Sequence, residues 1–408
     1  MLLAQVAARQ IALLDDARKA RMLRGIADAI EAATDAVVAA NAQDLDRARE
    51  SGLSIALQDR LTLDAARVAA LASAVREVAG LPDPVGRVLE QRTLDNGLDL
   101  TKIAVPFGVV GTIYEARPNV TVDIAALALR SGNAVVLRGG TAAERTNAAL
   151  VQAMREALAA EGVDPEAIQT LDEFGRAGAQ ELMHARGIVD VLVPRGSAQL
   201  IETVVTESTV PVIETGAGVV HVYLDESAPL ERARDIVVNA KVQRPSVCNA
   251  AETVLVHAAA AERVVGPVVE ALQAAGVTVH GDDTVARLAD GVVPADETDW
   301  ATEYLSLDIA MRVVDDLDDA LAHIRRYSTH HTESIITDDE AATERFLAEV
   351  DSAVVMANAS TRFTDGGEFG FGAEVGISTQ KLHARGPMGL RELTSSKWVV
   401  RGAGQVRG

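Results

Sequence analysis

The sequence contains a single cysteine, Cys248, among its 408 residues. One cysteine excludes an internal disulfide and any metal site built on a cysteine cluster. A lone thiol in a chain of this length is typical of a reducing compartment, so we expect a cytoplasmic location. The eight histidines show no HxH or HxxxH spacing, and we therefore expect no metal site.

Long apolar runs are also lacking. The longest stretch without a charged residue is Ile103–Tyr114, twelve residues, whereas a membrane-spanning helix needs about 18. The first ten residues, MLLAQVAARQ, lack the basic start, the apolar core and the cleavage site of a signal peptide. We expect no membrane partner.

Basic residues are scarce relative to acidic ones. The chain has 38 Lys and Arg against 59 Asp and Glu, a formal net charge of −21. Such a chain repels polyphosphate, so we expect no nucleic-acid partner, and a phosphorylated ligand must be held by local donors. The length and the ordinary globular composition, 48% apolar and 24% charged, predict two or three folded domains.

The distribution of apolar residues predicts the fold class. The first eighty residues indicate helices, because apolar residues recur three and four positions apart, as at Leu23, Ile26 and Ile30. From Val105 onward, short Val and Ile runs alternate with Ala-rich amphipathic stretches, and a second such series begins near Val219. Strict alternation indicates βαβ units, so the sequence predicts an α/β fold with two domains built on parallel sheets.

The individual elements follow from the same pattern. In the first series we predict strands at Val109–Ile113, Ala134–Leu137, Ile168–Leu171, Val189–Val193 and Val210–Ile213, and helices at Val122–Arg130, Ala142–Ala160, Gly175–His184 and Ala198–Thr206. In the second we predict strands at Thr253–Val256, Ile309–Val314, Ile335–Thr337 and Val354–Ala357, and helices at Leu230–Lys241, Leu317–Arg326 and Glu340–Glu349. Ligands on such sheets bind at the carboxyl ends of the strands.

One segment, RTLDNGLDLTK, differs from both series. Asn96-Gly97 between alternating residues is the strongest short-range hairpin signal. An isolated hairpin is marginally stable, so it must find a further partner. That partner is either another subunit or the hairpin's own chain, and the pattern favours neither.

Cys248 is the first candidate for chemistry. In KVQRPSVCNAAE it follows a predicted helix and precedes a strand, and its neighbours are polar. It is either a nucleophile that attacks a carbonyl carbon or a buried small hydrophobe. The polar neighbours favour the nucleophile, and Arg244 would favour its thiolate form.

Two turns after predicted strands could hold a nucleotide. Pro194-Arg195-Gly196 leads into Ser197 at a helix N-terminus, which suits a phosphate but is also typical of an ordinary connection. Arg138 precedes two glycines, with no carboxylate following in the sequence before Glu144, and could place a cation and an open backbone against a nucleotide. Neither a P-loop nor a GxGxxG motif follows any predicted strand.

Taken in order, several segments resemble the aldehyde dehydrogenase superfamily, and within it the gamma-glutamyl phosphate reductase family. They are YEARPN, LRGG, PRGS, ETGAGVV, RPSVCNA, EYLSLDIA and FTDGGEFGFGAEVGIST, within a match from Arg92 to Arg401. The resemblance implies two Rossmann-like α/β domains with parallel sheets and a small β oligomerisation arm. The cofactor-binding domain would span 1–220 with the hairpin arm at about 92–104, the catalytic domain 221–365, and 366–408 would complete the substrate site and the arm.

The resemblance also implies a function. It is the NADPH-dependent reductive dephosphorylation of L-glutamyl 5-phosphate to L-glutamate 5-semialdehyde through a cysteine thioester, in proline biosynthesis. A homodimer or homotetramer is expected, and a transient complex with glutamate 5-kinase is compatible with it. The alternatives are an aldehyde dehydrogenase for another aldehyde, with water or coenzyme A as acyl acceptor, and a non-catalytic module.

The resemblance assigns roles to particular residues. Cys248 matches the catalytic cysteine, and Asn119 is the candidate amide for the oxyanion. Glu214 falls at the general-base glutamate, a puzzle in an enzyme that must exclude water, and we count it among the residues around the cofactor. The expected cofactor-binding residues are Arg138, Gly196, Ser197, Glu214 and Glu303, and the expected substrate-binding residues are Arg117, Arg362, Ser246 and Asn249.

Overall fold

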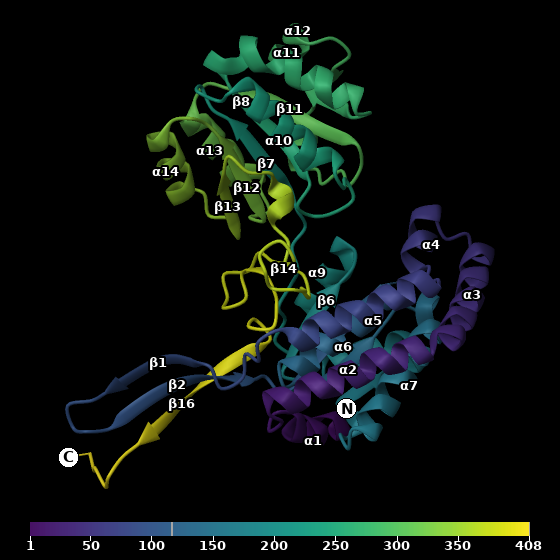
Figure 1. The fold of residues 1–408 in the computed structure, drawn as a ribbon. Helices are drawn as coiled ribbons and strands as arrows, with labels where there is room; N and C mark the ends of the chain where they lie inside the picture. The colour runs from purple at the N-terminus through teal and green to yellow at the C-terminus, as the bar shows by residue number, and fades with distance from the viewer. Residues whose placement is uncertain (116, 408) are drawn as a thin grey trace. The chain divides into compact units, whose positions relative to one another are not determined.

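The structure, a computed structural model, describes residues 1–115 and 117–407, and only the backbone of residues 55 and 56. The chain divides into two compact units (Figure 1). Unit 1 comprises Met1–Thr215, Gly370–Gly376 and Met388–Gly408, and unit 2 comprises Gly216–Phe369 and Ile377–Pro387. The segment 366–408, predicted as one piece, is thus shared between the two units.

The first eighty residues are helical, as the apolar spacing predicts. They form α1 (Leu2–Ile11), α2 (Asp16–Ala32), α3 (Thr34–Glu50), α4 (Ile55–Leu61) and α5 (Ala65–Gly80). Asp15 and Asp64 cap α2 and α5, because each side chain accepts a hydrogen bond from a backbone N–H of the first turn. Leu23, Ile26 and Ile30 of α2 are buried. Helices α2, α3 and α5 pack on α6 and α7 and form an outer layer.

Unit 1 is built on a parallel sheet with the strand order β5-β4-β3-β6. Its strands are β3 (Val109–Tyr114), β4 (Ala134–Arg138), β5 (Ile168–Thr170) and β6 (Val191–Arg195), and its helices are α6 (Pro118–Arg130), α7 (Glu144–Ala160), α8 (Gly175–Met183) and α9 (Ala198–Glu207). The strand predicted at Val210–Ile213 is wrong, since the segment makes only an isolated bridge between Val212 and Leu192. Pro211 lacks the N–H that a longer ladder requires.

The hairpin predicted at Asn96-Gly97 is confirmed. Strands β1 (Val88–Thr93) and β2 (Asp99–Pro106) pair antiparallel, and Gly97 in the turn has a φ of 81°. The second partner of β2 is β16 (Thr394–Arg401) of the same chain, so the arm is a three-stranded sheet. It extends away from the helices of unit 1 (Figure 1), and every residue of β1 is exposed.

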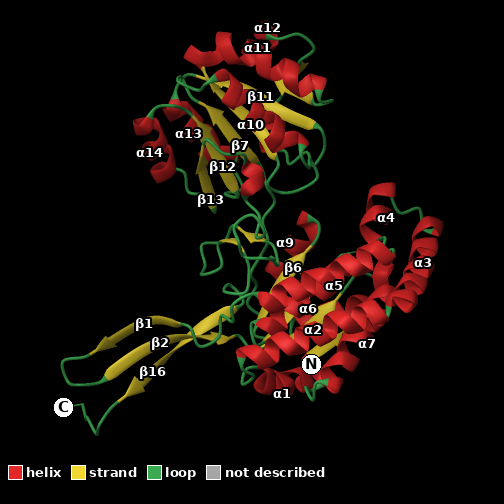
Figure 2. Ribbon diagram, in the orientation of Figure 1, coloured by secondary structure: helices red, strands yellow, loops and turns green. Residues whose placement is uncertain are grey.

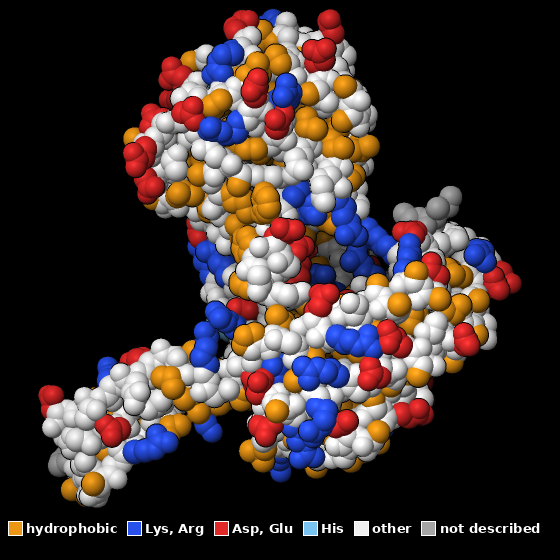
Figure 3. Space-filling view, in the orientation of Figure 1, with side chains coloured by type: hydrophobic (Ala, Val, Ile, Leu, Met, Phe, Trp, Pro, Cys, Tyr) orange, Lys and Arg blue, Asp and Glu red, His pale blue; other side chains and the backbone are white. Residues whose placement is uncertain are grey.

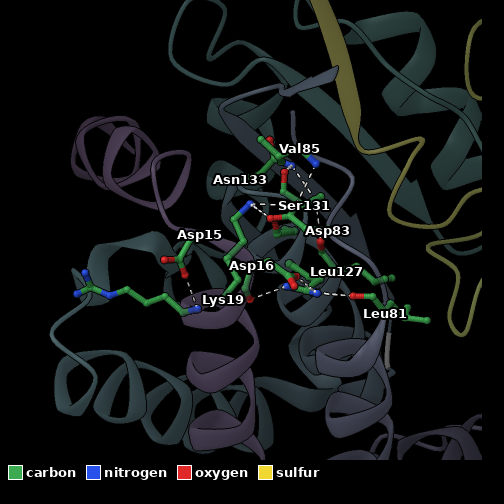
Figure 4. A network of polar contacts seen from close by, with 12 residues as sticks. Asp15, Asp16, Lys19, Leu81, Asp83, Val85, Leu127, Ser131 and Asn133 are labelled. Carbon is green, nitrogen blue, oxygen red and sulfur yellow. Dashed lines mark hydrogen bonds and ion pairs between the residues drawn. The ribbon is translucent and has the colours of Figure 1, made fainter. Parts of the chain in front are cut away.

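A polar network holds the arm to the helices at the roots of its three strands (Figure 4). Before β1, Asp83 accepts from the Nζ atom of Lys19 at 2.8 Å and from the backbone of Val85 at 2.9 Å. After β2, the side chain of Asn133 accepts from Gly108 N at 3.0 Å, and its Nδ2 donates to Leu393 O, before β16, at 2.9 Å.

Unit 2 contains a seven-stranded parallel sheet with the order β10-β9-β11-β8-β7-β12-β13. Its strands are β7 (Val220–Leu224), β8 (Ala251–His257), β9 (Thr278–Gly281), β10 (Val293–Pro294), β11 (Asp308–Val314), β12 (Thr332–Ile336) and β13 (Val354–Ala357). Its helices are α10 (Leu230–Val242), α11 (Ala258–Ala274), α12 (Asp283–Leu288), α13 (Leu317–Tyr327) and α14 (Glu340–Glu349), and a short ribbon joins β14 (Ile377–Ser378) to β15 (Gly386–Pro387).

Helices cover both faces of the unit 2 sheet (Figure 2). Val222 and Leu224 pack with residues of α10 and α11, whereas Tyr223 between them packs on the opposite face with Phe346 of α14. This alternation is the period of two that a strand imposes on its side chains.

Charged and apolar side chains are interspersed on the face of the molecule seen in Figure 3. On the face in Figure 3, acidic side chains are scattered over both units, and basic side chains lie among them over the helices of unit 1. Arg76–Glu31 and Arg21–Glu161 are among the ion pairs on the surface of the helices of unit 1. In the described part of the chain, none of the helices is both long and apolar enough to cross a bilayer.

Candidate active site

The predicted site residues are distributed over both units. Arg117, Asn119, Arg138, Gly196, Ser197 and Glu214 belong to unit 1, and Ser246, Cys248, Asn249, Glu303 and Arg362 belong to unit 2. In unit 1 they lie at or beyond the carboxyl ends of the parallel strands, where ligands of such sheets bind.

Ser197 caps the N-terminus of α9, and its hydroxyl accepts weakly from Leu200 N at 3.4 Å. The carboxylate of Glu115, which follows β3, binds the same turn. It accepts from the Ser197 backbone N–H at 3.1 Å and from the Ser197 hydroxyl at 2.6 Å, and its carbons lie against Gly196. A turn that binds a carboxylate through these donors also fits the anionic pyrophosphate of a dinucleotide.

Arg138 ends β4 and is half-buried, and its Nε donates to Gly175 O at 3.2 Å. A carboxylate also lies at this turn: Asp172 accepts from Gly139 N at 2.6 Å and from Asn147 Nδ2 at 2.8 Å. Asp172 follows β5, so the sequence around Arg138 gives no sign of it. Because both of its oxygens have donors and the side chain is buried, Asp172 orders the turn.

Arg117 and Asn119 begin α6. Arg117 is the N-cap residue and half-buried, and the Nδ2 of Asn119 donates to Asp123 one turn later at 3.1 Å. Burial raises the pKa of the Asp123 carboxyl to about 6, although Asn119 and Arg195 oppose the shift. Glu214 is half-buried and lies beyond β6, shortly after the bridge at Val212.

Cys248 lies in the loop that joins α10 to β8 and is half-buried, with Ser246 exposed beside it. The next residue, Asn249, is buried and ties the loop to the segment after β13. Its Nδ2 donates to Thr364 O at 2.7 Å, and its backbone oxygen accepts from the Thr361 hydroxyl at 2.7 Å. Asn249 therefore anchors the cysteine loop, and this use competes with the substrate-binding role that we predicted.

The backbone of Gly218 is pressed against the cysteine. A Cβ atom at position 218 would lie 1.5 Å from the backbone oxygen of Cys248, a distance no side chain allows. The Gly218 N–H donates to the carboxylate of Glu303 at 2.7 Å. Glu303, which precedes β11, thus supports the backbone that packs on Cys248, and burial raises the pKa of its carboxyl.

Arg362 stands on the other segment that contacts the cysteine loop. Its Nε donates to the side chain of Gln243 in that loop at 2.8 Å. Burial lowers the pKa of Arg362, and the negative charges of Asp365 and of a Cys248 thiolate oppose this shift, while Arg244 adds to it. The loop that carries the thiol therefore has two arginines in its electrostatic surroundings.

Sequence reasoning missed Glu115, Gly218 and Asp172. Glu115 lies inside YEARPN and Gly218 inside ETGAGVV, segments noted for other residues, and only the fold shows what they touch. Among the described residues, no group of three or more His, Cys, Asp and Glu side chains is placed to hold a metal ion.

The profile of the aldehyde dehydrogenase family matches residues 2–287 of this chain. An engineered glycolyl-CoA reductase with bound NADP+ has the same fold, with a TM-score of 0.69 at 18% identity over 97% of this chain and 94% of that one. The chain therefore belongs to the aldehyde dehydrogenase family.

Two more similar proteins narrow the assignment within this family. The chain is 66% identical over 405 residues to the gamma-glutamyl phosphate reductase of Clavibacter michiganensis subsp. michiganensis, which covers 99% of this chain and 94% of that protein. The crystal structure of the gamma-glutamyl phosphate reductase of Thermotoga maritima matches with a TM-score of 0.97 at 44% identity, over 100% of this chain and 98% of that one. Within that family the chain belongs to the gamma-glutamyl phosphate reductases. It is an oxidoreductase of proline biosynthesis that reduces L-glutamyl 5-phosphate to L-glutamate 5-semialdehyde with a nicotinamide cofactor.

Proposed function

We propose that this reduction proceeds through a thioester on Cys248 and uses NADPH. The observation that carries the proposal is the placement of a half-buried thiol on an anchored loop whose surroundings include Arg244 and Arg362. Positive charge near a cysteine favours the thiolate, which is the nucleophilic form.

The thiolate attacks the carbonyl carbon of the acyl phosphate, and phosphate departs with the bonding electrons, leaving the thioester. The oxyanion that forms in this step needs donors, for which we propose the Cys248 backbone N–H and the Asn119 amide. NADPH, when bound, supplies the hydride that reduces the thioester carbonyl. Release of the aldehyde returns the thiol, and one proton is consumed in the overall reaction.

The substrate presents an α-carboxylate and a phosphate, and arginines bind both groups well. We propose Arg117 and Arg362 for them, with Ser246 as a further donor. Arg362 is the better supported, because its guanidinium already interacts with the loop that carries Cys248.

For the cofactor we propose the Gly196-Ser197 turn for the pyrophosphate and Arg138 for the 2′-phosphate of NADPH. Glu115 must leave Ser197 when an anion takes its place. Glu303 and Glu214 complete the proposed cofactor surroundings. Water near the thioester must be excluded, since hydrolysis would release glutamate, so Glu214 cannot serve here as a base for water.

We further propose that the protein is a homodimer or homotetramer joined through the three-stranded arm, and that glutamate 5-kinase, which makes the unstable acyl phosphate, associates with it transiently. The arm supports the first proposal, because Val88, Leu89, Trp398 and Val400 are exposed on it.

The test of the chemistry is an assay in the reverse direction, in which glutamate semialdehyde, phosphate and NADP+ yield NADPH and acyl phosphate. We expect the Cys248→Ser variant to lose turnover by at least about a thousandfold while it still binds NADPH, because a hydroxyl without an adjacent base is a poor nucleophile. Retained turnover would contradict the role of Cys248. Turnover that does not need phosphate would favour an enzyme that transfers the acyl group to water.

A further inference from the structure

Lys241 and Glu252 form a buried ion pair at the base of the cysteine loop. Lys241 lies in the last turn of α10, and Glu252 is the second residue of β8, so the two residues flank the loop that carries Cys248. The Lys241 Nζ atom lies 2.6 Å from Glu252 Oε2, and both side chains are fully buried. The pair therefore closes the loop at its two ends.

The second oxygen of Glu252 holds another segment. Glu252 Oε1 accepts from the backbone N–H of Leu305 at 3.3 Å. Leu305 has a φ of 54°, in the left-handed region that bulky residues rarely adopt, and such a conformation persists only where its surroundings hold it. The same turn contains Tyr304, whose ring centroid lies 5.9 Å from Lys241 Nζ.

This turn also presents Glu303, and its carboxylate accepts from Gly218 N at 2.7 Å. Gly218 in turn packs against the backbone oxygen of Cys248. Glu252 is thus linked to Cys248 by two sets of contacts. The first is the ion pair with Lys241, which joins the two ends of the cysteine loop. The second is the hydrogen bond to the 303–305 turn, which in turn contacts Gly218. The Glu252 carboxylate takes part in both.

Stability alone does not account for such a pair. Removing two charges from water is expensive, and apolar replacements of buried ion pairs are often equally or more stable. Burial raises the pKa of the Glu252 carboxyl to about 7, which reflects the same cost. An apolar pair could not make the two directed hydrogen bonds that the Glu252 carboxylate makes, one with the backbone N–H of Leu305 and one with Lys241 of α10.

We propose that Glu252, together with Lys241, is the positioning residue of the nucleophile. It fixes the Cys248 loop relative to the turn that carries Glu303. This inference rests on the proposed role of Cys248, and the experiment separates the two.

Four variants test the inference: Glu252→Gln, Glu252→Gln with Leu305→Gly, Lys241→Met with Glu252→Met, and Ser306→Ala as a control in the same turn. Each is assayed for kcat and KM in the reverse direction, for the rate of Cys248 alkylation by iodoacetamide, and for its thermal midpoint. The glutamine keeps an acceptor for Lys241 but cannot hold both partners as the carboxylate does.

We expect Glu252→Gln to lower kcat about 10- to 100-fold with KM within about threefold, because small displacements of a reacting group have effects of this size. Leu305→Gly should restore part of the lost kcat, since glycine adopts a positive φ without support. The double methionine variant has no charge at either of these two buried positions and should fold, yet it should show the same loss of kcat. Ser306→Ala should match the wild type.

Wild-type kcat in the double methionine variant would overturn the proposal, because a merely structural pair can be replaced by apolar side chains. Failure of Leu305→Gly to raise kcat in the glutamine background would also overturn it. The role of Cys248 is tested separately by the Cys248→Ser variant. If that variant is active, and if the other variants change the alkylation rate of Cys248 without changing kcat, the result contradicts the role of Cys248 as the nucleophile.

Discussion

Arg138 is the side chain to which we attribute the proposed preference for NADPH. The fold brings the buried carboxylate of Asp172 to the turn after Arg138, where its oxygens accept from Gly139 and Asn147. Arg138→Glu should weaken NADPH binding at least about tenfold more than NADH binding, since it replaces attraction of the 2′-phosphate by repulsion. Fluorescence titration of both cofactors measures this, and equal losses would place Arg138 away from the phosphate.

Asp123 gives a prediction of pH dependence. Its carboxyl ionises near pH 3.8 in an unfolded chain and at about 6 in the folded one, so between these values the folded state binds more protons. Folding stability contributed by this group therefore falls as the pH rises from about 4 to 6. A two-unit difference in pKa corresponds to about 3 kcal/mol at most.

The Asp123→Asn variant stays neutral throughout. Its free energy of unfolding relative to the wild type should rise between pH 4 and pH 7 by up to about 3 kcal/mol, measured by urea denaturation at each pH. Asp46→Asn, at a side chain that is 70% exposed, serves as the control and should show no such trend. A constant difference for Asp123→Asn across this range would contradict the shifted pKa.

Individual residues also show which parts of the site could be predicted from the sequence. Cys248 could be singled out because a lone thiol among polar neighbours is unusual, but the contacts of Glu115 and Asp172 come from other strands. Glu252 carried a usable signal, since a charge inside the apolar run AETVLVH must find a buried partner. That its partner is Lys241 depends on how α10 packs against the sheet, and no local sequence pattern predicts this packing.

At the scale of elements, residue spacing was a good guide where it was regular. The helices of the first eighty residues and the strands β3, β4 and β13 follow from spacing and Val/Ile runs alone. No element was predicted between Val256 and Ile309, although α11 lies there. Its paired valines are typical of a strand, and a proline such as Pro267 is disfavoured inside a helix. The helix nevertheless runs through Pro267, and Val264, Val268 and Leu272 recur at helical spacing and are buried.

The network at the root of the arm provides an element-scale prediction. Lys19 is fully buried and pairs with Asp83, whose side chain is 13% exposed. Lys19→Met should cost about 3–5 kcal/mol of unfolding free energy, because it leaves the Asp83 carboxylate without its cation. Urea denaturation measures the loss.

A pair of similar geometry on the surface is the matched control. Arg49 and Asp46 lie 2.8 Å apart with side chains 60% and 70% exposed, so Arg49→Met should cost less than about 1 kcal/mol. Equal costs for the two variants would show that the Lys19–Asp83 pair acts like a surface pair. Lys19→Met with Asp83→Asn should recover part of the stability, since no unpaired charge remains.

At the scale of the whole molecule, the arm leaves one strand uncovered by its own chain. All of β1 is exposed, and β1 and β16 are both edges of the sheet, with unpaired backbone groups along their outer sides. Trp398 is 43% exposed although Arg92 and Lys102 each lie 5.8 Å from its ring centroid. Natural proteins rarely leave such an edge open, so a second subunit is the expected partner.

Replacement of Arg92–Lys102 by a short glycine linker should therefore yield a monomer, whereas the wild type should be a dimer or tetramer at micromolar concentration. A standard interface buries roughly 1,600 Å², and apolar burial contributes about 25 cal/mol per Å², so loss of the arm removes most of the association energy.

Because the deletion could disturb β16, a second variant, Val88→Lys with Val400→Lys, keeps all three strands and places charge on exposed apolar positions. Light scattering should give a lower mass for both variants, with thermal midpoints of the units unchanged for the second. A wild type that scatters as a monomer would contradict the role of the arm, and a tetramer that survives both changes would place the interface on the helical surface of unit 1 or on unit 2.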